Sequence, residues 1–408
     1  MVRKRLLQWF VRSLATVAVL SVVGLTVLFA ALWWEHKTGI TLPTPTGPFA
    51  VGRTMYAWIN NAETDELAPS PGTKREVVVW IWYPAARTSA APAEYLPAPW
   101  RVAEAQHSGV LMTKFFTRDL SLVRTHSTSD PEVSSEQRSY PVVIMRAGGG
   151  ALTTDYTTLA EDLTSHGYIV VGFDAPHRTS LVVFPDQRVV ERPPADDPEN
   201  LNGDEANRLI NRLLPMWTSD TTFVVSQLQQ LNAADPSGKF TGRLDMQRLG
   251  MFGHSFGGAT ALQFCHDDIR CKAGIDIDGA PFGSVVQEGL SQPFMFILSD
   301  HSRELSDPAA RQILADIHSI YGGLPGRFLI TIHGAHHFSF SDQALLKSQY
   351  LIRVLSSVAG FGKLDARRGL AITASYVDTF FDVYLKGAPS TLLTDIARQY
   401  PEVQAESR

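Results

Sequence analysis

The chain has 408 residues, of which 44% are hydrophobic, and a formal net charge of −5. This length and composition suffice for one large α/β domain with additions, or for two domains. Charges of both signs are spread along the chain without a basic block, which argues against a nucleic-acid partner.

The N-terminal segment 13–34 carries no charged residue and is long enough to span a bilayer as a helix. Basic residues precede it in the segment 1–12, and Trp33 and Trp34 suit the outer interface. The positive-inside rule then predicts a single-pass anchor with 1–12 in the cytoplasm and the remaining chain in the periplasm or outside the cell. A cleaved signal peptide is the alternative, although its apolar region is usually shorter.

Residues 35–50 are rich in proline and are expected to form an extended linker. A catalytic domain is predicted over 51–390. Its first strands are expected at 51–60 and 76–83, and the second is apolar on both faces, as in a central strand. The less regular block 87–138 is expected to form a partial cap over the site. This expectation rests only on the position of the block in the sequence.

From residue 140 strands alternate with helices. The predicted strands are 141–145, 168–173, 248–253, 272–277, 293–298 and 327–332. A second cap-like insertion is expected at 179–235, long helices at 342–359 and 365–385, and a tail at 391–408. The alternation indicates a mainly parallel sheet of about eight strands with helices on both faces, and a sharp turn after the fifth strand fits the α/β-hydrolase fold.

That turn is Gly253-His254-Ser255-Phe256-Gly257, a G-x-S-x-G pattern. An apolar strand precedes it and small residues follow it, which predicts a nucleophile elbow with the serine at the tip of a strained turn. Glycine suits the flanking positions because side chains would collide across so tight a turn. The alternative is an ordinary strand–turn–helix with a surface serine.

A serine nucleophile needs a base and an orienting acid, which in this fold follow it in the order Ser, acid, His. The candidates lie just after the later strands: Asp276, Asp278, Asp300, His333, His336 and His337. Asp278 stands at the tip of its strand, but the pattern alone leaves Asp278 and Asp300 equally open. The histidines lack nearby acidic or cysteine residues at ligand spacing, so neither a metal nor a cofactor is expected.

Several motifs resemble the platelet-activating-factor acetylhydrolase family of phospholipases A2. They are LPTPTGPFAVG, VWIWYPA, GHSFGG, KAGIDIDG and the histidine segment ending in FSFSD. The resemblance implies that the acid is Asp278 and that the base is His337, the histidine followed by Phe at the third position and Asp at the fifth. It also implies calcium-independent hydrolysis of a short or oxidised sn-2 acyl ester of a phospholipid.

An oxyanion hole needs backbone N–H groups aimed at the developing charge. Phe256, which follows the nucleophile, and Gly149, in the glycine-rich loop 146–151, are the predicted donors. Relatives commonly have a His-Gly pair where this chain has Arg146 and Ala147, which leaves the role of the missing histidine open.

The alternative functions are other ester hydrolases that use the same three residues, or a protein without catalytic activity. A general carboxylesterase or a polyester hydrolase would use the same three residues, whereas a catalytically silent, membrane-tethered binding protein would have one of them displaced. Cys265 and Cys271 are the two cysteines of the chain, and the spacing allows either a disulfide or two free thiols.

Overall fold

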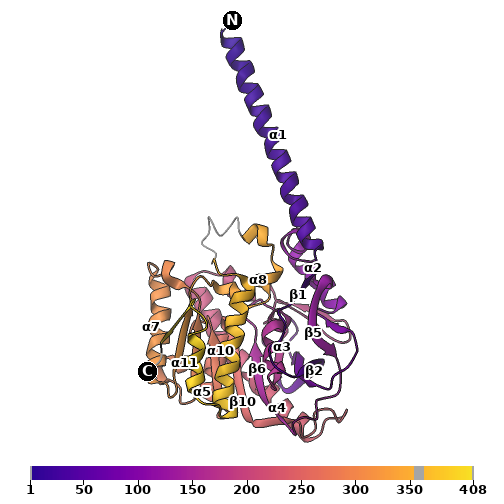
Figure 1. The fold of residues 1–408 in the computed structure, drawn as a ribbon, viewed down its shortest axis with the longest axis vertical. Coiled ribbons are helices and arrows are strands. Elements are labelled where there is room, and N and C mark those ends of the chain that lie inside the picture. Colours follow the sequence, from indigo (N-terminus) through magenta and orange to yellow (C-terminus); the bar gives the residue numbers. More distant parts are fainter. Residues whose placement is uncertain (1, 353–362, 407–408) are drawn as a thin grey trace.

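The computed structural model describes residues 2–352 and 363–406 (Figure 1). Its main sheet follows the order β1-β5-β2-β3-β7-β6-β10-β11-β12-β13-β14, with β4 beside β5. The bounds are β1 (Ile40–Thr41), β2 (Ala50–Thr64), β3 (Lys74–Ala85), β4 (Pro92–Glu94), β5 (Val123–Ser129), β6 (Tyr140–Arg146), β7 (Ile169–Asp174), β10 (Leu244–His254), β11 (Cys271–Ile277), β12 (Phe294–Leu298), β13 (Phe328–Ile332) and β14 (Val403–Glu406).

The strands from β7 to β13 are parallel, whereas β2, β3 and β14 add antiparallel pairs. A separate hairpin pairs β8 (Leu181–Val183) with β9 (Val189–Glu191). The predicted α/β-hydrolase layout of a mainly parallel sheet with helices on both faces is confirmed, and the sharp turn follows β10. The sheet has twelve strands rather than about eight, because short strands extend both of its edges. Parallel strands buried on both faces require apolar residues on both faces, which is what β6 has.

Helices cover both faces of the sheet. On one face α3 (Thr157–Ser165) and α10 (Ala366–Lys386) pack against one apolar cluster, and on the other α4 (Gly203–Ala233), α5 (Phe256–Asp267) and α7 (Pro308–Gly323) pack against a second. Smaller helical elements are α2 (Ala98–Leu111), η1 (Met112–Phe116), η2 (Leu120–Leu122), η3 (Thr153–Tyr156), η4 (Pro194–Asp196), η5 (Pro198–Asn200), α6 (Val285–Glu288), η6 (His301–Arg303), η7 (His337–Phe340), α8 (Gln343–Leu346) and α11 (Thr391–Ala397).

Two C-terminal expectations need correction. The segment 391–408 is not a tail, because its described residues form α11 and β14, and β14 pairs with β13. The long helix expected over 342–359 is interrupted in its described part, because α8 ends at Leu346 and Lys347 is extended, and the chain is helical again over 349–352. Residues 353–359 of that expectation lie outside the described residues.

The N-terminal helix α1 (Val2–Lys37) projects from the domain (Figure 1). In the described part of the chain it is the one helix long and apolar enough to cross a membrane. Its last turn includes the first residues of the expected linker and is docked on the domain. Buried Glu35 accepts hydrogen bonds from Ser348 Oγ at 2.5 Å and Gln349 N at 2.9 Å, and Arg118 donates to the Glu35 carbonyl at 3.3 Å.

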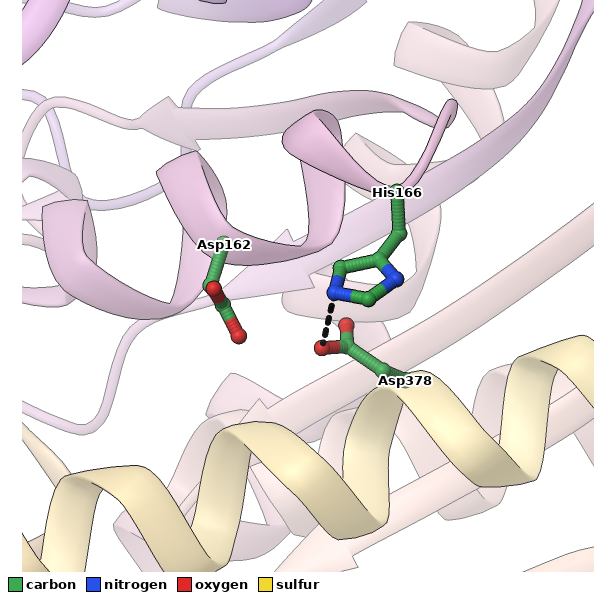
Figure 2. A group of neighbouring side chains, drawn as sticks. All are labelled: Asp162, His166 and Asp378. Carbon is green, nitrogen blue, oxygen red and sulfur yellow. Dashed lines mark ion pairs between the residues drawn. The ribbon is translucent and has the colours of Figure 1, made fainter. Parts of the chain in front are cut away.

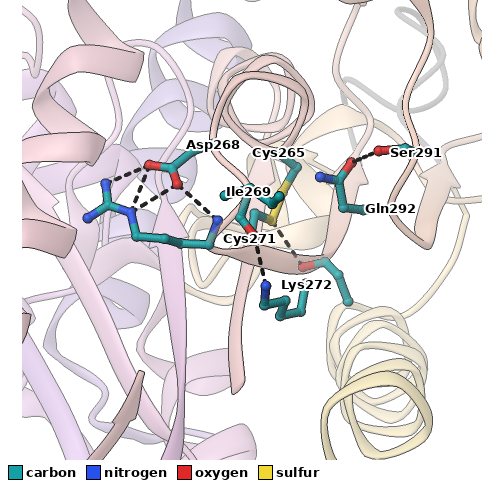
Figure 3. Close-up of a disulfide and its surroundings, with 9 residues drawn as sticks. Cys265, Asp268, Ile269, Cys271, Lys272, Ser291 and Gln292 are labelled. Carbon is teal, nitrogen blue, oxygen red and sulfur yellow. Dashed lines mark hydrogen bonds and ion pairs between the residues drawn. A yellow bond between two sulfur atoms is a disulfide. The ribbon is translucent and has the colours of Figure 1, made fainter. Parts of the chain in front are cut away.

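The two cysteines form a disulfide that links the end of α5 to the first residue of β11 (Figure 3). Their Cα atoms lie 5.0 Å apart, within the range that a disulfide spans. The bridge therefore fixes the connection between the helix that follows the elbow and the neighbouring strand.

Candidate active site

The sharp turn joins β10 to α5 with no intervening loop. Ser255 has φ 56° and ψ −126°, a conformation that side chains rarely adopt, and its N–H donates to the Ile277 carbonyl at 2.9 Å. A Cβ on Gly257 would overlap the carbonyls of Arg146 and Ala147, so the turn packs directly against the glycine-rich loop. The backbone thus holds the Ser255 side chain at the carboxyl end of the sheet.

Asp278 follows β11 and sits at the centre of a hydrogen-bond cluster. Its Oδ2 lies 2.8 Å from His337 Nδ1 and accepts from Ser299 Oγ at 2.9 Å. Its Oδ1 accepts from Ser299 N at 2.7 Å and lies 2.9 Å from His301 Nε2. The buried carboxylate therefore has four donors on its two oxygens.

The hydrogen bonds to Asp278 shift the pKa values of Asp278 and His301. Burial would raise the pKa of Asp278, but its hydrogen bonds and electrostatic interactions with His301 and His337 lower that pKa well below its usual range. The same contact with Asp278 raises the pKa of His301 to about 9, against the effect of its partial burial and with a further contribution from Glu304. Asp278 is therefore ionised at neutral pH, and His301 carries a positive charge beside it.

His337, at the start of η7, is held from a second side by His254. The two rings lie 4.5 Å apart, and His254 Nε2 is 2.8 Å from the His337 carbonyl. Burial, followed by the neighbouring His337, lowers the pKa of His254 to about 3, so its ring is neutral. Since Nε2 must donate to the carbonyl, Nδ1 accepts from Tyr156 OH at 2.7 Å, and Tyr156 OH accepts from Gly148 N at 3.2 Å.

The other sequence candidates lie apart from this cluster. Asp300 Oδ2 accepts from Gly334 N at 3.2 Å and is 3.9 Å from His333 Nδ1. Buried Asp276 accepts from Gly279 N at 2.9 Å, and burial raises its pKa well above the usual range. His336 Nδ1 accepts from Phe338 N at 3.2 Å. The structure thus brings Asp278 to His337 and directs Asp300 towards His333.

The expected oxyanion donors face one another across the turn. A Cβ on Gly149 would be 3.9 Å from the Phe256 Cβ, and a Cβ on Gly148 would be 3.1 Å from the Ser255 Cβ. In the described part of the chain, neither Gly149 N–H nor Phe256 N–H donates to a protein acceptor. Both groups can therefore receive a negatively charged oxygen beside Ser255.

Ser255, His337 and Gly149 line a cleft of about 1050 Å³. Ser255, His337 and the glycines at 148–150 line its floor, and residues between 96 and 121 supply much of its wall. Several side chains in or beside its rim are apolar and exposed: Val102, Val110, Leu111, Met112 and Phe338. His36, in the docked end of α1, also lines the cleft.

Arg146 ends β6 at the glycine-rich loop, and its buried side chain is not part of the cleft lining. Its guanidinium lies 3.9 Å from the Phe173 ring centroid and 4.3 Å from that of Trp217, which contacts Phe256 at 4.9 Å between centroids. Burial lowers the pKa of Arg146 to about 10, so it remains charged at neutral pH. Arg146 therefore packs beneath the glycine-rich loop and, through Trp217, supports the ring of Phe256.

Fold and site define this chain as a serine ester hydrolase. The sequence model of the family "Platelet-activating factor acetylhydrolase, isoform II" matches residues 35–386, and the chain belongs to that family.

Relatives with assigned names agree with this classification. A probable 1-alkyl-2-acetylglycerophosphocholine esterase of Arthroderma benhamiae is 25% identical over 89% of this chain and 92% of its own length. The platelet-activating factor acetylhydrolase of Canis lupus familiaris is 25% identical over 74% of this chain and 68% of its own. The solved structure of a ferulic acid esterase from Streptomyces cinnamoneus superposes with a TM-score of 0.72 at 25% identity, covering 91% of this chain and 100% of the esterase.

The pH dependence of stability tests the His301–Asp278 contact. The contact raises the pKa of His301 to about 9 from an unfolded value of about 6.5. Its stabilisation is therefore complete below the unfolded pKa and is lost as pH rises through the folded pKa. We expect the Tm difference between wild type and His301→Gln to be largest near pH 6. It should shrink towards pH 10, a pH about one unit above the raised pKa.

His318→Gln is the matched control, because His318 is half-exposed on α7 and lies 3.7 Å from the half-exposed carboxylate of Glu406, farther than His301 lies from buried Asp278. Its Tm difference should vary little over the same range. A His301→Gln difference that stays constant with pH would show that His301 is not charged by Asp278.

Proposed function

We propose that this protein hydrolyses the short-chain sn-2 ester of a phospholipid, with Ser255 as nucleophile, His337 as base and Asp278 as orienting acid. The observation that carries the proposal is the 2.8 Å contact of buried Asp278 with His337, which lines the same cleft as Ser255 on its strained turn. The family and the named relatives support the same chemistry.

In the proposed reaction Ser255 Oγ attacks the ester carbonyl carbon and gives its proton to His337 Nε2. The Asp278 carboxylate holds Nδ1–H, which fixes the tautomer and stabilises the imidazolium. The N–H groups of Phe256 and Gly149 bind the oxyanion. His337 then protonates the departing alkoxide. Water, deprotonated by His337, attacks the acyl-enzyme and releases the acid and free Ser255.

The position of the cleft favours a lipid substrate. Its wall includes His36 from the docked end of α1, and its rim carries exposed apolar side chains. A helix able to cross a membrane therefore ends beside the cleft. An ester embedded at the membrane surface would reach Ser255 over a short path, with its apolar chain against this rim.

A second candidate is a general carboxylesterase. The specific observation in its favour is the ferulic acid esterase, which superposes over its full length on this chain. Such an enzyme would use the same three residues on a soluble ester, so only substrate preference separates the two candidates.

Activity of variants tests both the residues and the substrate. We expect Ser255→Ala to abolish turnover of an sn-2 acetyl phospholipid by the full-length enzyme in mixed micelles. Asp278→Asn should lower kcat by roughly 10⁴-fold, because His337 loses the acceptor that fixes its tautomer. Asp300→Asn is the matched control and should stay within a few-fold of wild type, since Asp300 contacts Gly334 and His333.

Methyl ferulate and p-nitrophenyl acetate serve as comparison substrates in the same assay. A kcat/KM higher for the phospholipid than for both soluble esters supports the phospholipase proposal, and the reverse order supports the carboxylesterase. A large loss in Asp300→Asn with an active Asp278→Asn would contradict the assignment of the acid.

We further infer that α1 stays on the mature protein as a single-pass anchor, with 1–12 cytoplasmic and the catalytic domain in the periplasm or outside the cell. Basic residues before the apolar segment support this orientation. The buried hydrogen bonds of Glu35 support retention, because cleavage after the apolar segment would leave them at a chain end.

Cysteine labelling on intact cells tests this orientation. A membrane-impermeant maleimide should modify Thr88→Cys, in the exposed cap, and should leave Gln8→Cys unmodified until the cells are lysed. The full-length chain should also remain in membranes after an alkaline carbonate wash. Labelling in the opposite order would reverse the orientation, and a soluble chain that lacks the N-terminal segment would indicate a cleaved signal peptide.

A further inference from the structure

A second cluster of charged side chains lies between α3 and α10 (Figure 2). Asp162 belongs to α3, His166 follows the end of that helix, and Asp378 belongs to α10. One potential ligand atom from each residue lies within 4.8 Å of the other two. None of the three lines the catalytic cleft. The cluster is therefore separate from the chemistry proposed for Ser255.

Both carboxylates of the cluster are buried. Asp162 is 7% exposed and Asp378 is 5% exposed. Asp162 Oδ1 accepts from Thr46 N at 2.6 Å, whereas in the described part of the chain Asp378 Oδ1 is buried with no donor other than the carboxyl of Asp162 beside it. Burial, followed by the charge of Asp162, raises the pKa of Asp378 well above its usual range. Two facing carboxylates out of water need either a shared proton or a cation between them.

Neighbouring cations do not fill this role. Lys386 is the basic group that lowers the pKa of Asp378, but its ammonium donates to Asp382 Oδ1 at 2.9 Å and to the His166 carbonyl at 2.7 Å. His166 Nε2 lies 3.5 Å from Asp378 Oδ2 and 2.8 Å from Thr46 Oγ1. The imidazole nitrogen thus faces both a carboxylate and a hydroxyl.

We propose that Asp162, His166 and Asp378 form a binding site for a divalent transition-metal cation of the Zn²⁺ type. One imidazole nitrogen and two carboxylate oxygens suit such a cation, whereas Ca²⁺ and Mg²⁺ prefer oxygen ligands alone. His166 Nε2 and Asp378 Oδ2 lie 3.5 Å apart, and one ligand atom of Asp162 lies within 4.8 Å of both residues, so the three can converge on one cation. Thr46, which is exposed, leaves the site open to solvent and to a fourth ligand.

The position of the site suggests its effect. Asp378 lies on α10, Asp162 and His166 lie at the end of α3, and Thr46 lies in the linker that leads from α1. A bound cation would join these three segments, so its binding to the folded chain should stabilise the domain.

The test is calorimetric titration of Zn²⁺ into the full-length, chelator-treated protein in detergent. We expect one equivalent to bind to wild type and to raise its Tm. Asp378→Asn and His166→Gln should each lose this equivalent and the Tm increase. His318→Gln, which removes a more exposed histidine on α7, and His337→Gln, in the catalytic cleft, should both retain it.

Two further outcomes keep the proposal open to refutation. Co²⁺ bound to wild type should give a visible absorption band, and this band should disappear when Zn²⁺ displaces the Co²⁺. This measurement uses only the wild-type protein and so does not require any variant to fold. If Zn²⁺ leaves the Tm of wild type unchanged and Asp378→Asn raises it in chelator, the two acids share a proton and the site does not exist. Loss of the equivalent in His337→Gln would place the metal in the cleft and would also overturn the proposal.

Discussion

The close packing of the turn at Ser255 against the glycine-rich loop is the constraint on which the site depends. The carbonyls of Arg146 and Ala147 leave no space for a side chain on Gly257. Ser255 itself is held at a positive φ, a strain that costs on the order of 1–3 kcal/mol and persists only where the surrounding structure enforces it. Here the enforcement comes from the sheet, because Ser255 N–H bonds the end of β11 while α5 starts at the next residue. The nucleophile and both expected oxyanion donors are therefore placed by one backbone contact.

His337, the proposed base, is positioned by two separate sets of hydrogen bonds. On one side Asp278 is kept ionised inside the protein by four donors, and it holds the Nδ1 atom of His337. On the other side His254 contacts the His337 ring and its carbonyl, and Tyr156 links His254 to Gly148. Because Gly148 belongs to the loop that packs under the turn, the base and the loop are connected through neutral groups. Such connected networks are stiff when every member is satisfied.

The fold was largely predictable from local pattern, because buried parallel strands are continuous apolar runs and the elbow has its own signature. The C-terminal β14 was missed because a run of four residues is too short to predict a strand from sequence, and its place is set by pairing with β13. In the site, the ends of the strands predicted where the candidate residues gather. The spacing did not decide whether Asp278 or Asp300 contacts the histidine, and Asp278 was preferred because of the family resemblance. Tyr156 and His301 had no local signal, because Tyr156 meets His254 across 98 residues of sequence and His301 meets Asp278 across 23.

Covalent labelling tests most directly whether Ser255 is the activated nucleophile. The full-length enzyme would be treated with a fluorophosphonate, digested and examined by mass spectrometry. The structure predicts one adduct, on the peptide that contains Ser255, and much slower labelling in His337→Gln, because His337 is the group that takes the serine proton. An adduct on another residue, or continued ester hydrolysis by an enzyme that is fully labelled at Ser255, would contradict this account.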